Sequence, residues 1–201
     1  MSKIVHLQMP LSEQQVRDLE IGDEVYLSGD ALCMLYGSHY SLILDALKAG
    51  ERSPMELEGR AIYNTGVIWR REGMENKLYA LGTTASYKFN AFGPDFIRRT
   101  GIRAIIGKGG MDDATLDAMQ ECGCVFLAIA GGCTSVFTPK ARIVEEYLPA
   151  IPPSDNQRLR FELNEFGPLM VTMDAHGNSL YHDTTDKVDS RRKAVYERAG
   201  I

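Results

Sequence analysis

A lysine stands inside a short run of glycines, Gly107-Lys108-Gly109-Gly110, after the apolar segment 104–106 and before an acidic helix start at 112–113. Glycine has no Cβ, so backbone N–H groups in such a strand-to-helix turn approach a ligand closely, and the helix start adds partial positive charge. A P-loop needs Ser or Thr directly after the lysine, where this chain has Gly109, so nucleotide phosphate is disfavoured. We expect a small carboxylate in the turn, the alternative being a tight connection with a solvated lysine.

Hydroxyl groups and a histidine stand at two other predicted helix starts. The run Thr83-Thr84-Ala85-Ser86 gathers hydroxyls that cap a helix, bind a ligand, or do both. His39 follows Ser38, the predicted N-cap of a helix with an i, i+3, i+4, i+7 apolar pattern and an end at Gly50. His39 is then the first residue of that helix, where the helix dipole disfavours a protonated imidazole. The neutral ring stays available as an acceptor or donor of a hydrogen bond. A solvated or capping histidine is the alternative interpretation.

Alternating strands and helices position these residues. The strand 103–106, the glycine turn, a helix with Leu116 and Met119 inward and the apolar strand 125–130 predict a parallel βαβ unit. A second glycine turn at 131–135 follows that strand, so we expect it beside Lys108 at the carboxyl edge of one sheet, where α/β proteins bind ligands. Further strands are expected at 25–27 (ending at Ser28-Gly29), 60–63 and 66–69 around an Asn64-Thr65-Gly66 turn, 77–81, 160–163 and 169–174.

The remaining segments connect or surround these elements. Residues 11–30 begin as a leader to the first core strand, and Gly93-Pro94 interrupts the helix that follows the hydroxyl run, either kinking it or starting a second short helix. Residues 151–154 mark a break, and a polar tail from His182 ends in a basic surface helix. We expect residues 1–201 to form a single domain.

Composition excludes several classes of function. The net charge is −5 and basic residues form no contiguous stripe, so binding to nucleic acid is not expected. No apolar run approaches the roughly 20 residues that cross a bilayer, and the first residues lack a signal peptide, so a cytoplasmic protein with no membrane partner is expected. The cysteines predict free thiols and no disulfide or metal site of this chain's own: Cys33, Cys122, Cys124 and Cys133.

Four segments together resemble the β subunit of iron–sulfur-dependent L(+)-tartrate dehydratase and of two-subunit class I fumarase. They are VYLSG at 25–29, GTTAS at 82–86, GKGGM at 107–111 and the stretch from FGPL to DAHGN at 166–178. The resemblance implies an α/β fold of the swivelling β/β/α type. It also implies a hetero-oligomer with an α subunit whose cysteines hold a 4Fe-4S cluster with one open iron. A homodimer of this chain is the further possibility.

In that family, water is eliminated from a 2-hydroxy dicarboxylate, with the open iron as Lewis acid and an oxygen-bearing side chain taking the proton. Carried over by position, the resemblance implies that the catalytic residues are Thr84, Lys108 and His39. It implies that Lys88 stands at the family's arginine position and holds substrate carboxylate. The other residues expected at the substrate are Ser86, Gly107, Gly109, Gly110 and Tyr36, the last shaping the far end of the pocket with His39.

Three departures from the family pattern bear on activity. Leu35-Tyr36 stands where the family has an Arg-Asp pair, and Ala85 replaces the second threonine. Lysine offers a point charge where arginine grips carboxylate with a fork, so Lys88 is no equivalent replacement. Losing one charge-assisted hydrogen bond of roughly 1.5 to 3 kcal/mol lowers a rate or affinity by about one to two powers of ten. The chain is then either an active hydro-lyase half for tartrate, malate or a relative, or an impaired paralogue that serves as a binding or regulatory subunit.

Overall fold

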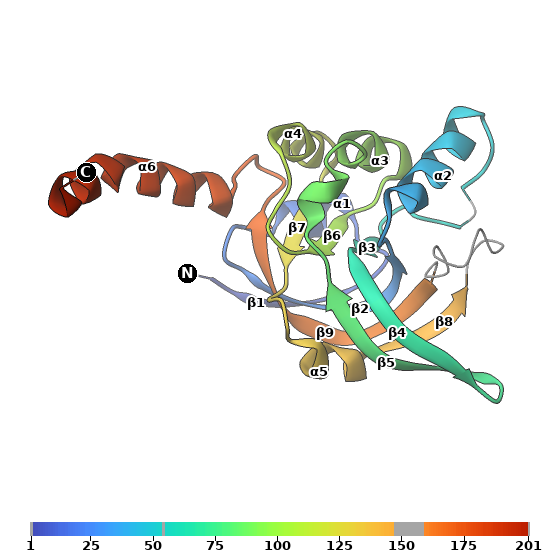
Figure 1. Ribbon diagram of the computed structural model, residues 1–201. Helices are drawn as coiled ribbons and strands as arrows, with labels where there is room; N and C mark the ends of the chain where they lie inside the picture. The colour runs from blue at the N-terminus through green and yellow to red at the C-terminus, as the bar shows by residue number, and fades with distance from the viewer. Residues whose placement is uncertain (1, 54, 147–158, 201) are drawn as a thin grey trace.

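The computed structural model describes residues 2–53, 55–146 and 159–200. One sheet runs in the order β1-β2-β3-β6-β7-β9-β8 (Figure 1). A further pairing of β2 with β9 closes β2, β3, β6, β7 and β9 into a ring. The strands of this sheet are β1 (Ile4–Gln8), β2 (Glu24–Cys33), β3 (Ala61–Tyr63), β6 (Ala104–Gly107), β7 (Val125–Ala128), β8 (Ala141–Glu146) and β9 (Leu159–Met173).

A separate two-stranded hairpin and several helices complete the fold. The hairpin pairs β4 (Thr65–Glu72) with β5 (Glu75–Thr83). The helices are α1 (Glu13–Arg17), α2 (Gly37–Lys48), the 3₁₀ turn η1 (Ser86–Phe89), α3 (Gly93–Thr100), α4 (Asp113–Cys122), α5 (Thr134–Phe137), η2 (Thr138–Lys140) and α6 (Leu180–Ala199).

The strands β2, β3, β6 and β7 are parallel neighbours, and their alternating side chains feed two cores. Along β6, Ala104 and Ile106 point into the interior of the closed sheet, whereas Ile105 points toward the helices. The helices α2, α3 and α4 cover this second face, as Figure 1 shows. Strands buried on both faces read as continuous apolar runs. The α/β fold and the parallel βαβ unit formed by β6, α4 and β7 are confirmed.

Aromatic side chains dominate the core beneath the helices. Tyr40 of α2 stacks on Phe89 and packs edge-on against Phe96, with ring centroids 5.0 Å apart in both pairs. Full burial of one such side chain contributes about 1.5 to 3 kcal/mol. The apolar periodicity that predicted the helix at 40–47 is confirmed, because Tyr40, Ile43 and Leu44 are buried. This packing fixes the start of α2 against the end of the sheet.

The strands predicted at 60–63 and 66–69 are present as β3 and β4, but the turn predicted between them at 64–66 is wrong. Strand β3 lies parallel between β2 and β6, and β4 pairs only with β5 among the described strands. Asn64 is fully buried, with none of its surface exposed. An Asn-Thr-Gly sequence is typical of turns, but here the asparagine satisfies its polar groups inside the protein.

Several element boundaries also differ from the prediction. Helix α2 begins at Gly37, so its N-cap is Tyr36 and not Ser38, and His39 is its third residue. The second short helix expected at Gly93-Pro94 is confirmed as α3, with Pro94 in its first turn. The two strands expected at 160–163 and 169–174 are parts of the single strand β9. The break expected at 151–154 lies outside the described residues.

The sequence prediction missed the elements at the N-terminus. Residues 11–30 are not a leader, because they contain α1, whose N-cap Ser12 forms a capping box with Gln15. The strand predicted at 25–27 is confirmed as part of β2, which is longer than predicted. Strand β2 continues through Gly29, whose φ of +108° accompanies a shift of register with β9. Strands β1 and β8 were also missed. Both lie at the ends of the strand order, where only part of each strand contacts the core.

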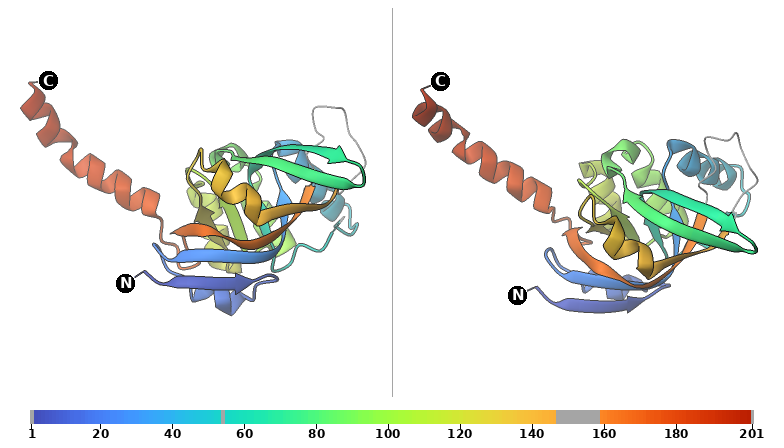
Figure 2. Two further views of the ribbon diagram at one scale, coloured as in Figure 1. Left: turned by 90° about the horizontal axis from the view of Figure 1, so that it is seen from below. Right: turned by 60° about the horizontal axis from the view of Figure 1, so that its bottom comes forward.

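Two elements extend away from the body of the molecule. Figures 1 and 2 show α6 running outward from the sheet, and its residues include none that are fully buried. The expected surface helix at the C-terminus is thereby confirmed, although it starts at Leu180. The hairpin β4–β5 projects on the other side (Figure 2). Within the described parts of the chain, the model contains no helix with the length and apolarity needed to span a bilayer.

Candidate active site

The carboxyl ends of the parallel strands meet at one edge of the sheet. Hydrogen bonds between neighbouring segments of the backbone continue past the strand ends there, and they hold the first loop residues in register. The N–H groups of the residues directly after β2, β3 and β7 each donate to a neighbouring strand: Met34 to the carbonyl oxygen of Tyr63 at 2.8 Å, Asn64 to Ile106 at 2.9 Å, and Ile129 to Gly107 at 2.9 Å.

Lys108 is the cation at this edge. Its side chain is half-buried, and within the described parts of the chain its ammonium group makes no hydrogen bond or ion pair. A Cβ built on Gly131 would stand 3.4 Å from Lys108 Nζ, so the second glycine turn lies beside the first, as predicted. The N–H of Ser86 donates to the Lys108 carbonyl oxygen at 3.0 Å and fixes the turn from the other side. A cation that lies beside the second turn and has no acidic partner among the described residues is suited to an anionic ligand.

The helix start after the glycine turn is not free for that ligand. Asp112, the N-cap of α4, accepts hydrogen bonds from the N–H and the hydroxyl of Thr115 at 3.1 and 2.6 Å. The carboxylate thus occupies the positive end of α4. Gly109 and Gly110 adopt φ values of +79° and +69°, which favour glycine. The partial positive charge expected from the helix start is therefore used by Asp112, and Lys108 and its loop are left to bind the ligand.

Two hydroxyl residues follow strand β5 and have different surroundings. The N–H of Thr84 donates to the Asn64 carbonyl oxygen at 2.8 Å, and within the described residues its hydroxyl is not bonded. Ser86 is fully buried, and its hydroxyl donates to Asn64 Oδ1 at 2.8 Å. Thr84 therefore presents a hydroxyl at the edge of the sheet, whereas Ser86 uses its hydroxyl inside. Lys88, in η1, is exposed and forms no ion pair within the described ranges.

His39 and Tyr36 lie at the start of α2. His39 is 1% exposed, and its Nδ1 accepts the Leu35 N–H at 3.3 Å, which places any single ring proton on Nε2. The acceptor nitrogen is thus engaged by the backbone directly before the helix, as in the capping alternative, and a role of His39 at a ligand stays a prediction. Tyr36 is 39% exposed and meets the His39 ring edge-on at 5.5 Å between centroids. Of the pair, Tyr36 is the side chain that reaches solvent.

Asn64, which the sequence predicts in a turn, connects these groups. Its Nδ2 donates to the Met34 carbonyl oxygen at 3.2 Å and to the Tyr40 hydroxyl oxygen at 2.6 Å. Burial raises the pKa of Tyr40 and keeps that hydroxyl protonated. One signal could have identified Asn64: it stands directly after an apolar strand, as Lys108 does after β6.

The cysteines are spread through the fold. Cys33 and Cys124 are fully buried, and burial raises the pKa of both thiols. Within the described residues no three His, Cys, Asp or Glu side chains are grouped closely enough to hold a metal ion. The described cysteines are free thiols, as predicted. Thiolate ligation of a cluster needs convergent, ionised sulfurs, which this arrangement does not supply.

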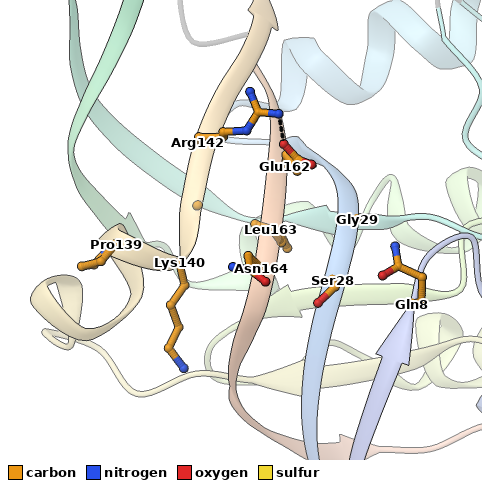
Figure 3. Close-up of a pocket in the computed structure, with 10 residues that line it drawn as sticks. Gln8, Ser28, Gly29, Pro139, Lys140, Arg142, Glu162, Leu163 and Asn164 are labelled. Atoms are coloured by element: carbon orange, nitrogen blue, oxygen red, sulfur yellow. Dashed lines mark ion pairs between the residues drawn. The ribbon is translucent and has the colours of Figure 1, made fainter.

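A polar cavity of about 480 Å³ lies away from this edge, on the outer face of the sheet formed by β8, β9, β2 and β1 (Figure 3). Its cations already have partners. Arg142 is paired with Glu162, and Lys140 Nζ donates to the carbonyl oxygens of Glu165 at 3.0 Å and Gly167 at 2.7 Å. The Lys108 edge is therefore the stronger candidate for binding an anionic substrate.

Comparison with known proteins identifies relatives along nearly the whole chain. Residues 1–184 match the family model for the fumarase C-terminus. The putative L(+)-tartrate dehydratase subunit beta of Methanocaldococcus jannaschii is 34% identical over 179 residues, which cover 89% of this chain and 91% of that protein. The L(+)-tartrate dehydratase subunit beta of Escherichia coli is 28% identical over 191 residues, covering 95% and 93% of the two chains.

A longer protein also matches. The putative fumarate hydratase class I of Geobacillus stearothermophilus is 33% identical over 184 residues, covering 90% of this chain but 34% of that protein. The match therefore equals about a third of the longer polypeptide. The resemblance drawn from the glycine turn and the hydroxyl run is confirmed: this chain belongs to the fumarase C-terminus family.

Proposed function

We propose that this chain is the β subunit of a hydro-lyase that reversibly eliminates water from a 2-hydroxy dicarboxylate such as tartrate or malate. The observation that carries the proposal is the environment of Lys108. Lys108 is half-buried, its ammonium group lies beside the second glycine turn, and it has no acidic partner among the described residues. The names of the relatives, tartrate dehydratase subunit beta and class I fumarate hydratase, point to the same class of reaction.

The roles proposed for the side chains follow from what each one exposes. Lys108 binds one substrate carboxylate, and Lys88, exposed on η1, assists at the same group or at the second carboxylate. Thr84 presents its hydroxyl for proton transfer at Oγ1, since its backbone is fixed to Asn64. His39 contributes at the other end of the pocket through Tyr36, whose partly exposed ring meets the buried imidazole edge-on.

The remaining residues assigned to the substrate act through the shape of the turn. Ser86 is committed to Asn64, so we propose that it contributes through its N–H bond to Lys108. Gly107 leaves space for the Ser86 hydroxyl, and Gly110 leaves space for the ring of Tyr181. Gly109, with open space around it, is the turn glycine best placed to offer its N–H to a carboxylate.

We propose that an α subunit holds the 4Fe-4S cluster of this enzyme. The thiols of this chain do not fit a cluster, because two are fully buried and the described donors do not converge. The partner would complete the pocket over Lys108 and Thr84, which face the edge of the sheet. A ring-closed sheet with helices on one face also supports assigning the chain to the swivelling β/β/α class.

The alternative function is a binding or regulatory subunit without turnover. It is favoured by the residues before His39, where Leu35 and Tyr36 provide no charged group to grip a carboxylate. The cations at the site are then lysines only, which bind carboxylate without the fixed geometry of an arginine fork. Such a subunit would keep the α contact and the anion site while losing the reaction.

The test is turnover by this chain coexpressed anaerobically with a hydro-lyase α subunit from the same genome. Malate, fumarate and the tartrate stereoisomers are the substrates, and Lys108→Ala is the variant. Removing a charge-assisted contact that contributes roughly 1.5 to 3 kcal/mol should reduce kcat/KM about 10- to 100-fold or more, with no change in folding. The matched control is Lys48→Ala, which removes a lysine from the last turn of α2, at the opposite end of that helix from His39.

The outcomes separate the two functions. Turnover that falls in Lys108→Ala and persists in Lys48→Ala supports the hydro-lyase. An intact, cluster-loaded complex that converts none of the substrates contradicts it and supports the regulatory subunit. Loss of soluble protein in Lys108→Ala would mean that the lysine is structural; the lack of a side-chain partner among the described residues argues against this.

A further inference from the structure

We propose that Asn64 is the positioning residue of this site: it sets the place of Thr84 and of the Lys108 turn from the protein interior. The inference rests on the proposed function for its catalytic meaning. Asn64 lies between β3 and β4 and is completely inaccessible to solvent, so it does not contact substrate itself. Its polar groups are used by neighbours from separate elements.

The contact to Thr84 is direct. The Asn64 carbonyl oxygen accepts the Thr84 N–H at 2.8 Å, while the Asn64 N–H donates to Ile106 at 2.9 Å. The backbone of Asn64 therefore bridges strand β6 and the residue that carries the candidate catalytic hydroxyl. A shift of Asn64 moves Thr84 relative to the strand from which Lys108 emerges.

The contact to Lys108 runs through one intermediate. Ser86 donates its hydroxyl to Asn64 Oδ1 at 2.8 Å and its N–H to the Lys108 carbonyl oxygen at 3.0 Å. On the opposite side of the amide, Nδ2 donates to the Met34 carbonyl oxygen and the Tyr40 hydroxyl, at the start of the segment that carries Tyr36 and His39. Asn64 thus holds Thr84 through its backbone carbonyl, reaches the Lys108 turn through Ser86, and bonds through its side-chain amide to Met34 and Tyr40 beside the start of α2.

The chemistry of the amide explains why an asparagine stands there. Its nitrogen must face the Met34 carbonyl oxygen, an obligate acceptor, and its oxygen must face the Ser86 hydroxyl. An aspartate would place an oxygen against that carbonyl and bury a charge, and an apolar residue would leave the partners unsatisfied. Both donors and one acceptor of the side chain are satisfied, which is the condition under which a buried polar network specifies a single geometry.

The test combines a structural readout on the full chain with kinetics of the complex. Asn64→Ala removes the amide, and Tyr40→Phe is a milder variant that removes only one partner. Thr100→Ala is the matched control, because it deletes another buried hydroxyl, bonded to Phe96 at 2.6 Å within α3. Amide hydrogen exchange is measured at equal intervals below each melting temperature, which removes the effect of global stability.

We expect the amides at 84 and 86 to exchange at least about tenfold faster in Asn64→Ala, and measurably faster in Tyr40→Phe, than in Thr100→Ala. In the complex with the α subunit we expect kcat to fall about 10- to 100-fold while KM changes less than about threefold, because misplacement by about 1 Å acts on the chemical step. Thr100→Ala should keep both constants.

Each contrary result has a separate meaning. Unchanged exchange at 84 and 86 in both variants would overturn the positioning role. Faster exchange with unchanged kcat in an active complex would also overturn it, because the network would then be structural only. If the wild-type complex converts no substrate, the proposed hydro-lyase function fails, and the exchange result alone decides whether Asn64 fixes the two segments.

Discussion

The substitution Gly107→Ala tests the packing beneath the site most directly. A Cβ at position 107 would stand 1.9 Å from Ser86 Oγ and 3.1 Å from Phe126 Cζ, so the serine side chain or the backbone must move. If Ser86 rotates away, its hydroxyl loses the bond to Asn64 in a fully buried place. If the backbone moves instead, the bond between the Ser86 N–H and the Lys108 turn is strained.

The magnitude follows from these two routes. Forcing an extra methyl into a packed core costs about 1 to 3 kcal/mol, and an unsatisfied buried hydroxyl costs a similar amount. We therefore expect Gly107→Ala to lower the free energy of unfolding by about 2 to 4 kcal/mol. For a chain of 201 residues this corresponds to a drop in Tm of roughly 5 to 15 °C.

The assay is thermal and urea unfolding of Gly107→Ala, with Gly66→Ala as the control. A Cβ on Gly66 meets its nearest neighbour at 3.7 Å, an ordinary contact, so the control should match the wild type. The double variant Gly107→Ala with Ser86→Ala removes the closest clash and should be more stable than Gly107→Ala alone. A Gly107→Ala protein that melts within about 1 °C of the wild type would refute the reasoning.

Two further predictions concern the ends of the chain. Burial alone would raise the pKa of Asp23, but the N–H groups of Glu20 and Lys3 outweigh it and hold the pKa below its usual value. A carboxylate whose pKa is lower in the folded than in the unfolded state stabilises the fold above the unfolded pKa, and this stabilisation is lost as the pH falls through the folded pKa. Asp23→Asn should therefore cost about 1 to 2 kcal/mol at pH 7. The difference in urea midpoints between variant and wild type should shrink below about pH 4. A midpoint difference that is constant from pH 7 to pH 3 would contradict this. Deleting residues 183–201 should change Tm by less than about 2 °C, because the described part of this segment buries no residue; a larger loss in calorimetry would show that α6 supports the body.

Local sequence signals predicted the parts of the fold that depend on neighbours in the chain. The apolar runs of β6 and β7 were sufficient to predict strands, because a strand buried on both faces is apolar throughout. The periodic apolar faces of α2 and α4 were sufficient to predict helices, because a helix buried along one stripe repeats apolar residues every three to four positions. The neighbouring glycine turns followed from parallel topology alone. The short strand β1 gave no such signal, because its side chains alternate between exposed and half-buried.

The errors at the site have a common physical reason. Asn64 and Ser86 look like turn and cap residues because their side chains satisfy backbone groups in many loops. Here their partners are distant in the sequence: Tyr40 is 24 residues from Asn64, and Ser86 is 22. Pairing at that distance depends on how β3 lies between β2 and β6, which no local window contains.

The hairpin β4–β5 begins directly after Asn64 and ends directly before Thr84. Its two strands are hydrogen-bonded from Thr65 opposite Thr83 to Glu72 opposite Glu75. The distal loop, where Met74 is 99% exposed, is therefore the far end of a paired ribbon whose base is the candidate site and whose register shifts once, between Ile68 and Trp69. This makes the loop an attachment point for a spectroscopic label: a fluorophore there would report movement of the Thr84 backbone as a change in orientation, while its chemistry stays clear of the substrate.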